Sequence, residues 1–264
     1  MQLRSLLPVA FVLAACGKHE SHGVPRDAGA DAPAPATPHT SPAAHLVDAL
    51  LGQSDIIRRT FPLKSVALRI EDVHMSRALD AVVQRSDSAI FATNGGFFDP
   101  QNEPLGLALS NGHVLSKATK TPGGILLVEE AKGALYDAES FAFVAKPKAF
   151  GIQCLPRLVV KGEVNLPHDT GKRAERVALC LRDKGTVLDV VFARGKSIGL
   201  GPTLHELAEY LRGSGCEDAL NLDGGPSAGI AWREDGAVQM IAPRGAVRHA
   251  LVIHVLGGPT PPPP

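Results

Sequence analysis

The nine residues 219–227, ALNLDGGPS, are the stretch around which the rest of the sequence can be interpreted. Residues 219–222 are mostly apolar and typical of a short strand, and the turn that follows carries an acid, Asp223, and a hydroxyl, Ser227. The two adjacent glycines at 224–225 permit positive φ and a close approach of the backbone to a ligand. We therefore expect a strand that ends at a binding site.

A second stretch, IFATNGGFFD at residues 90–99, has the same pattern. A strand-like run again leads into paired glycines, here preceded by Asn94 and followed by Asp99. Each stretch is followed by a predicted hairpin, with Asn-Gly at 111–112 in one case and Asp-Gly at 235–236 in the other. An ancient duplication and a coincidence in a β-rich chain account for this equally well. We expect the two glycine turns to face each other and to form the site.

The composition limits the classes of function. Of the 264 residues, 44% are hydrophobic and 20% are charged, which suits one globular domain with tails. The 27 basic and 27 acidic residues give a formal net charge of zero. Bulk electrostatics therefore gives no reason to expect nucleic acid or an anionic membrane surface as a partner.

The N-terminus predicts export and lipid anchoring. A basic start at Arg4 precedes an apolar run at residues 6–13, which is too short to span a bilayer as a mature helix. The sequence LAAC at 13–16 is typical of a bacterial lipoprotein cleavage site, so we expect residues 1–15 to be removed and Cys16 to be lipidated. The alternative is an ordinary signal peptide with an incidental cysteine. The expected product is an exported bacterial lipoprotein, anchored to the membrane only through its lipid and facing the periplasm or the cell exterior.

Composition divides the mature chain into three parts. Residues 16–45 are rich in Ala and Pro and have little apolar mass to bury, so we expect a disordered tether. Residues 46–257 form the predicted domain, and residues 258–264 are a Pro-rich tail. The sequence does not determine the oligomeric state.

Strand-like runs dominate the predicted domain. Helical spacing occurs at residues 75–85, and residues 204–212 (LHELAEYLR) form the clearest helix, because Thr203 and Glu206 make a capping box and Gly213 ends the pattern. We expect an α+β fold, with a mixed, largely antiparallel β-sheet core and a few flanking helices in a single domain.

Three cysteines lie within the domain, at Cys154, Cys180 and Cys216. In an exported protein we expect a disulfide among them, although three cysteines cannot all pair within one chain. The sequence does not choose the pair. No two have the close spacing of zinc ligands, and buried small hydrophobic side chains are an equal alternative.

The conspicuous polar groups suit an anion and a polyol. Asp223 and Asp99 lie beside the glycine turns, and paired carboxylates cleave glycosidic bonds by acid–base chemistry. Arg157 and Arg176 lie at strand entrances, and guanidinium groups bind phosphate oxygens bidentately. The other candidates are the glycine backbones, which can bind an anion through their N–H groups, and neutral side chains that suit sugar hydroxyls: Gly95, Gly96, Gly224, Gly225, Asn94, Asn221 and Ser227.

Less specific roles for these residues remain open. Asp next to Gly more often caps a turn, and the two arginines could be solvated surface charges. Ser227 as an esterase nucleophile lacks the G-x-S-x-G spacing, and no single histidine is favoured as its base. No calcium- or magnesium-type loop is evident, so we expect neither a metal nor another cofactor.

Five segments in order resemble the phosphodiester glycosidase family. They are NGGFF at 94–98, Gly106 downstream of it, RVA at 176–178, TLxELA at 203–208 and LNLDGGxS at 220–227. The resemblance covers about residues 89–255. The first and last of these segments are fairly specific as a pair, whereas the arginine segment alone is weak.

The resemblance implies hydrolysis of a sugar-1-phosphodiester at its glycosidic C–O bond, in an envelope or extracellular glycan. It implies Asp223 as the catalytic carboxylate, Asp99 as a second one and Arg176 as the phosphate clamp. The remaining candidates would line the pocket. A phosphate monoester is a good leaving group, so such a site needs less general-acid assistance than an ordinary glycosidase.

This chain departs from the family pattern at three places. Cys180 and Pro226 stand where glycine is common, and Arg194 stands where Asp-Gly is common. Pro226 lacks an N–H, so it removes one donor from the expected anion site. A catalytically degenerate member that only binds glycans or phosphorylated polymers is therefore the alternative function.

Overall fold

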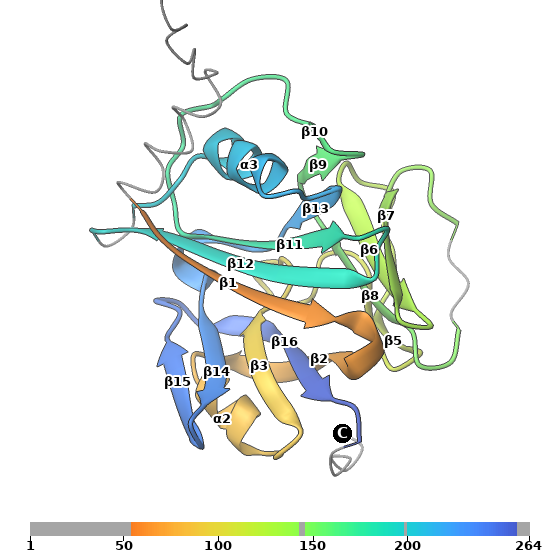
Figure 1. The fold of residues 1–264 in the computed structure, drawn as a ribbon, viewed down its shortest axis with the longest axis vertical. Helices are drawn as coiled ribbons and strands as arrows, with labels where there is room; N and C mark the ends of the chain where they lie inside the picture. The colour runs from red at the N-terminus through yellow and green to blue at the C-terminus, as the bar shows by residue number, and fades with distance from the viewer. Residues whose placement is uncertain (1–53, 143–145, 198–199, 258–264) are drawn as a thin grey trace, which may run out of the picture. The chain divides into compact units, whose positions relative to one another are not determined.

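A computed structural model of the chain describes residues 54–142, 146–197 and 200–257, all within one compact unit of residues 40–264. The predicted signal peptide, Cys16, the tether and the Pro-rich tail lie outside the described residues. Among those described, three β-sheets and two α-helices form the fold (Figure 1). None of the helices found there is long and apolar enough to cross a membrane.

The first sheet has six strands, and α3 (Leu204–Gly213) covers one of its faces (Figure 1). Buried Leu207, Ala208 and Leu211 of α3 pack on this sheet. In spatial order its strands are β1 (Ser54–Pro62), β12 (Val187–Gly195), β11 (Arg176–Arg182), β13 (Asp218–Asn221), β9 (Arg157–Val160) and β10 (Glu163–Val164).

The second sheet has five strands and packs against α2 (Leu79–Gln84) through buried Leu79, Val82 and Val83. Its strands, in spatial order, are β15 (Ala237–Ile241), β14 (Ile230–Glu234), β3 (Ala89–Asn94), β16 (Val247–Val255) and β2 (Val66–Ser76).

The third sheet also has five strands, ordered β5 (His113–Ser116), β4 (Ala108–Ser110), β8 (Phe150–Cys154), β6 (Gly124–Glu129) and β7 (Lys132–Asp137). Two short 3-10 helices, η1 (Leu63–Ser65) and η2 (Gly225–Ser227), complete the described elements.

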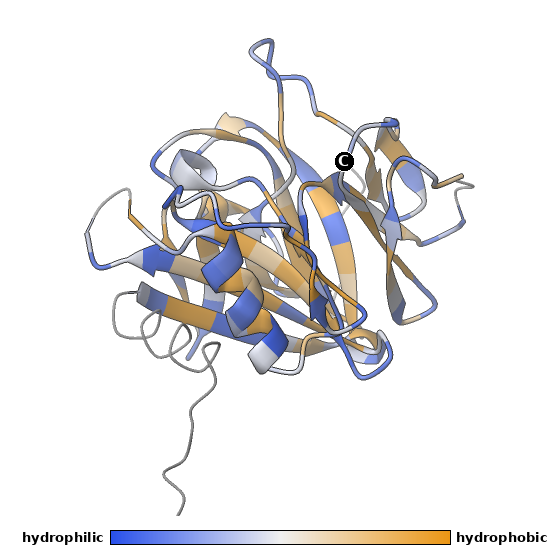
Figure 2. Cartoon of the chain, turned by 90° about the horizontal axis from the view of Figure 1, so that it is seen from above, coloured by the Kyte–Doolittle hydropathy of each residue, from blue (hydrophilic) through white to orange (hydrophobic). Residues whose placement is uncertain are grey.

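The inner faces of the three sheets share one hydrophobic core. Figure 2 shows hydrophobic residues concentrated on the strands and hydrophilic residues on the loops around them. Phe61 of the first sheet meets Phe91 of the second, with ring centroids 5.5 Å apart. Leu126 and Ile152 of the third sheet belong to the same buried cluster. Burial of apolar surface at this junction is the main force that holds the sheets together.

The fold is β-rich and mostly antiparallel with few helices, as predicted. The expected mixed sheet is wrong in one respect, because every strand pair in the described part of the chain is antiparallel. The strands also divide into three sheets rather than forming one core sheet.

Local signals predicted α3 well and α2 less well. At α3, the Thr203 hydroxyl accepts from the Glu206 N–H at 3.1 Å, and the Glu206 carboxylate accepts from the Thr203 N–H at 3.0 Å. The predicted helix at 75–85 is shorter in the structure, because its first two residues end β2, where Ser76 pairs with Val247. Strand pairing therefore overrides helical spacing there.

Cys180 of β11 and Cys216 form the disulfide, with their Cα atoms 5.7 Å apart. Cys154 is free and buried. The structure thus selects one of the pairings that the sequence left open.

The chain passes from one sheet to another at four crossings, the first of which is η1, between β1 of the first sheet and β2 of the second. The crossing after β3 runs from the second sheet to the third, and the crossing after β8 runs from the third to the first. The crossing after β13, residues 222–229, runs from the first sheet to the second. Both glycine turns noted in the sequence are therefore crossings between sheets.

Candidate functional site

Two buried asparagines tie the crossings after β3, β8 and β13 together. Asn94 ends β3, and its Nδ2 donates to the carbonyl oxygen of Asp223 at 2.7 Å. Asn221 ends β13, and its Nδ2 donates to the carbonyl oxygen of Leu155 at 2.9 Å. Each asparagine thus binds the backbone of another crossing. Because both side chains are buried and hydrogen-bonded, they hold the Asp223 turn and the Leu155 turn in fixed positions.

Cys154 occupies the corresponding place at the end of β8. The Phe97 N–H donates a hydrogen bond to its sulfur, and a Cβ on Gly96 would lie 3.3 Å from Sγ. Burial raises the pKa of the Cys154 thiol, and the nearby negative charge of Asp223 raises that pKa further. The thiol is therefore protonated at neutral pH and packs as a small apolar group. No signal in the sequence marked Cys154 as a site residue.

The two glycine turns are in direct contact, as the sequence predicted. The Asp223 N–H donates to the Gly95 carbonyl at 3.4 Å, and the Gly95 N–H donates to the His249 carbonyl at 2.8 Å. A Cβ on Gly95 would lie 3.0 Å from Cβ of His249, so a larger residue would push the turn away from β16. Gly225 has a φ of +57°, in the region that favours glycine.

Asp223 is a partly buried carboxylate at the contact between the two glycine turns. Its Oδ1 accepts from the Gly224 N–H at 2.8 Å, and the Ser227 hydroxyl donates to the same side chain. Burial raises the pKa of Asp223, and these two hydrogen bonds oppose that rise. A carboxyl group whose pKa moves towards neutrality is a common feature of catalytic sites.

Arg176 lies beside the Asp223 turn at the start of β11. A Cβ on Gly224 would be 3.7 Å from its Cδ. Its guanidinium donates to the Lys172 carbonyl at 2.9 Å and to the Pro202 carbonyl at 3.4 Å. Burial lowers the pKa of Arg176, and within the described residues it makes no ion pair with a carboxylate. Arg176 therefore carries a partly buried positive charge, and its side chain lies next to the glycine that follows Asp223.

Two other candidates are occupied by structural contacts. Asp99 caps its own loop, where its Oδ1 accepts from the N–H groups of Gln101 and Glu103, both at 2.9 Å. Arg157 forms an ion pair with Asp137 of β7. The contacts of Asp99 match the turn-capping alternative, whereas Arg157 is a paired, partly buried charge rather than a solvated one. The catalytic role of Asp99 and the substrate role of Arg157 remain predictions.

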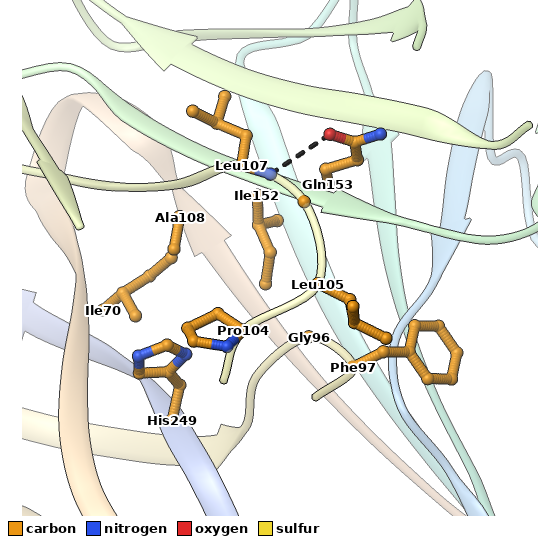
Figure 3. A pocket seen from close by; sticks show the side chains of 11 residues that line it. Ile70, Gly96, Phe97, Pro104, Leu105, Leu107, Ala108, Ile152, Gln153 and His249 are labelled. Atoms are coloured by element: carbon orange, nitrogen blue, oxygen red, sulfur yellow. Dashed lines mark hydrogen bonds between the residues drawn. The ribbon is translucent and has the colours of Figure 1, made fainter. Parts of the chain in front are cut away.

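The histidines have different surroundings. His254 is buried and shares a hydrogen bond of 3.0 Å with the Ser88 hydroxyl through Nδ1, which agrees with a structural role. His249 borders a small pocket of about 10 Å³, in which its ring lies beside Pro104 (Figure 3). Burial lowers the pKa of His249. No group of three His, Cys, Asp or Glu side chains in the described part of the chain could hold a metal ion.

Comparisons with known proteins identify similar folds. The chain resembles the catalytic domain of zebrafish N-acetylglucosamine-1-phosphodiester alpha-N-acetylglucosaminidase, auto-inhibited by its pro-peptide, with 19% identity, a TM-score of 0.59, and coverage of 76% of this chain and 83% of that one. It also resembles a hypothetical protein from Synechocystis, with 18% identity, a TM-score of 0.56, and coverage of 77% and 60%. At these identities the two structures show the fold alone.

A comparison with curated proteins gave no match. The sequence pattern of the phosphodiester glycosidases, however, matches residues 87–254, from the strand before the first glycine turn to the end of β16. That match contains both glycine turns, Arg176 and α3. The chain therefore belongs to the phosphodiester glycosidase family.

Proposed function

We propose that this protein hydrolyses a sugar-1-phosphodiester of an envelope or extracellular glycan at the glycosidic C–O bond. The observation that carries the proposal is that the Asp223 carboxylate is held by the Gly224 N–H and that the Arg176 side chain lies next to the same glycine. A phosphodiester of a sugar presents an anion and an anomeric carbon, each one bond away from the bridging oxygen. The positive charge of Arg176 is complementary to the phosphate anion, and the negative charge of Asp223 is complementary to the positive charge that develops at the anomeric carbon.

Each group has a distinct part in the reaction. Arg176 binds the non-bridging phosphate oxygens, because its charge is not neutralised by a carboxylate of the described residues. The ionised carboxylate of Asp223 stabilises the positive charge that develops at the anomeric carbon. The C–O bond breaks, the phosphate monoester leaves with the electron pair, and water supplies a hydroxyl group to the sugar and a proton to the solution.

The family and one structural relative support the reaction type. The zebrafish relative is named for an N-acetylglucosamine-1-phosphodiester, and the family is described as phosphodiester glycosidases. Turnover of an aryl diester of a sugar 1-phosphate by the purified full chain, with detection of free sugar, tests the proposal. Release of the aryl alcohol without free sugar would indicate phosphoesterase chemistry and contradict it.

Replacement of Arg176 tests the phosphate clamp. We expect Arg176→Ala to lower kcat/KM by about 10²- to 10³-fold, because the developing phosphate charge loses its main partner. Arg176→Lys should recover part of the loss, since it keeps the charge but not the bidentate fork. Arg85→Ala is the matched control, because Arg85 forms an exposed ion pair with Glu71 on the second sheet. Equal kinetics for Arg176→Ala and the control would refute the assignment.

Pro226 favours a second candidate function, binding without turnover. Pro226 is the middle residue of η2, in the turn between Asp223 and Ser227, and it has no backbone N–H to donate to an anion. A degenerate site would keep affinity for a sugar phosphate and lack hydrolysis. Titration calorimetry with a sugar 1-phosphate, run beside the turnover assay, separates the two functions.

We also propose that the protein is anchored outside the cytoplasm through a lipid on Cys16. The Cys180–Cys216 disulfide supports an oxidising compartment. Labelled palmitate should be incorporated into the wild-type chain and lost in Cys16→Ser. An unlabelled, soluble secreted product from the wild-type gene would contradict the anchor.

A further inference from the structure

A cavity of about 350 Å³ lies next to the crossings after β3 and β8, on the side of the third sheet. This volume is within the range of small-molecule sites. We call it the side cavity, and its lining is mostly apolar: Phe97, Phe98, Leu105, Gly106, Thr119, Thr121, Pro122, Gln153, Cys154 and Leu155. Two of these, Leu105 and Leu155, have exposed fractions of 51% and 47%. These two leucines therefore present apolar surface to a ligand in the cavity.

The side cavity is built from the same crossings as the site. Phe97 and Phe98 directly follow the first glycine turn, and Cys154 Sγ lies against Gly96. Leu155 contributes its side chain to the cavity and its carbonyl oxygen to Asn221. The Asn221–Leu155 hydrogen bond therefore joins the wall of the cavity to the strand that leads into the Asp223 turn.

Gln153 places two hydroxyl groups on the cavity wall. Its side chain is almost fully buried, and Nε2 donates to the Thr119 carbonyl at 2.8 Å and to the Thr121 hydroxyl at 3.3 Å. Its Oε1 accepts from the N–H groups of Leu107 and Thr119 at 3.1 and 2.9 Å. Figure 3 shows the Leu107 bond, with Phe97 and Leu105 nearby. Gln153 is thus a positioning residue, and Thr119 and Thr121 are the polar groups offered to a ligand.

The side cavity and Arg176 are both neighbours of the turn that carries Asp223. Arg176 approaches the turn at Gly224, whereas Cys154 and Phe97 approach it from the Gly95–Gly96 turn. If phosphate binds at Arg176 and the anomeric carbon at Asp223, the next group along the substrate is the sugar. The geometry points to the side cavity as the binding site of the glycosyl ring, and to an uncharged sugar as the glycosyl group. This inference rests on the proposed function.

The lining accounts for the preference for an uncharged sugar. None of the lining residues carries a charge, so a carboxylate or ammonium group of a sugar would lose water without gaining a partner. The two phenylalanine rings suit the apolar C–H face of a pyranose ring. Thr119 and Thr121 can then bind hydroxyl groups at its edge.

Binding measurements test the inference without requiring turnover. Titration calorimetry with the full chain would compare α-glucose 1-phosphate, α-glucuronic acid 1-phosphate and methyl phosphate. We expect glucose 1-phosphate to bind at least about tenfold tighter than methyl phosphate, and tighter than the glucuronic acid ester. Thr121→Val and Phe98→Leu should each weaken glucose 1-phosphate binding by about two- to tenfold and leave methyl phosphate binding unchanged. Thr186→Val, in the distant β11–β12 turn, is the matched control and should change neither.

The outcomes separate this inference from the proposed function. Sugar-dependent affinity that falls in Thr121→Val and Phe98→Leu supports the cavity, even if no diester is hydrolysed. Hydrolysis of an aryl diester with kinetics unaffected by both variants would keep the function and overturn the cavity. Equal affinity for glucose 1-phosphate and methyl phosphate, or for the neutral and the charged sugar, would also overturn it.

Discussion

Asp223→Asn is expected to abolish turnover of a sugar-1-phosphodiester while leaving the protein folded. A loss on the order of 10³-fold or more in kcat is the usual result when a charged catalytic group is removed. The asparagine is nearly isosteric, and its Oδ1 can still accept from the Gly224 N–H that binds Asp223 at 2.8 Å. Only the charge beside the anomeric carbon is lost.

Stability and activity should change in opposite directions in this variant. Burial raises the pKa of Asp223, so the ionised side chain costs the folded state free energy that the unfolded state does not lose. That cost is absent in acid below the unfolded pKa and present above the raised folded pKa. Asp223→Asn should therefore have a higher Tm than wild type at pH 7, and the difference should disappear near pH 3. The wild-type kcat/KM should also fall in acid at a higher pH than an ordinary aspartate would cause.

Asp218→Asn is the matched control for both measurements. Asp218 lies in the same strand that leads to the Asp223 turn, burial also raises its pKa, and its Oδ1 accepts from the Lys161 N–H outside the two glycine turns. The control should keep its turnover. Thermal unfolding at pH 3 and pH 7 should show the same direction of change in both variants, because burial raises both pKa values, and initial rates on the aryl diester would then distinguish them. Unchanged turnover in Asp223→Asn would remove Asp223 from the catalytic role.

Local features of the structure could be predicted from local sequence signals. The capping box of Thr203 and Glu206 and the Asn-Gly turn at 111–112 each depend on neighbouring residues, and both are present in the structure. Asn111 and Gly112 have φ angles of 51° and 82°, as such a turn requires. The two glycine turns were also identified correctly, because paired glycines directly after an apolar strand are a strong signal for a turn.

Long-range features could not be predicted in this way. The Asn94 bond to the Asp223 carbonyl joins residues 129 apart in sequence, and the same residue pattern fits a solvated turn equally well. Cys154 gave no signal, because a free cysteine in a strand is ordinary until its neighbours are known. Arg157 and Arg176 occupy similar places in sequence, yet of these two only Arg157 faces a carboxylate of the described residues, Asp137. Which carboxylate an arginine meets depends on which strands become neighbours in a sheet, and no local pattern in a single sequence encodes that.

The second large effect is expected at Asp189, which lies outside the candidate site. Asp189 of β12 is fully buried and accepts hydrogen bonds from Arg182 Nε at 2.6 Å and from the Thr60 hydroxyl at 2.6 Å. It also forms an ion pair with Arg58. The side chain therefore links three adjacent strands, β1, β12 and β11, of the first sheet. We expect Asp189→Asn to destabilise the fold by about 3–5 kcal/mol, because it leaves two partly buried arginines without their anion.

The pH dependence of that effect follows from the same contacts. Burial alone would raise the pKa of Asp189, but hydrogen bonds from Arg182, Thr60 and Arg58 outweigh it and hold the pKa below its usual range. The contribution is therefore present above the unfolded pKa and is lost as the pH falls through the depressed folded pKa. Urea unfolding should show a large difference in the free energy of unfolding between wild type and Asp189→Asn at pH 7, and this difference should shrink in acid.

The control variant is Asp55→Asn, which breaks the exposed Asp55–Arg194 pair between β1 and β12. It should change the free energy of unfolding by no more than about 1 kcal/mol. Similar unfolding midpoints for these two variants would show that the buried network contributes no more than a surface pair.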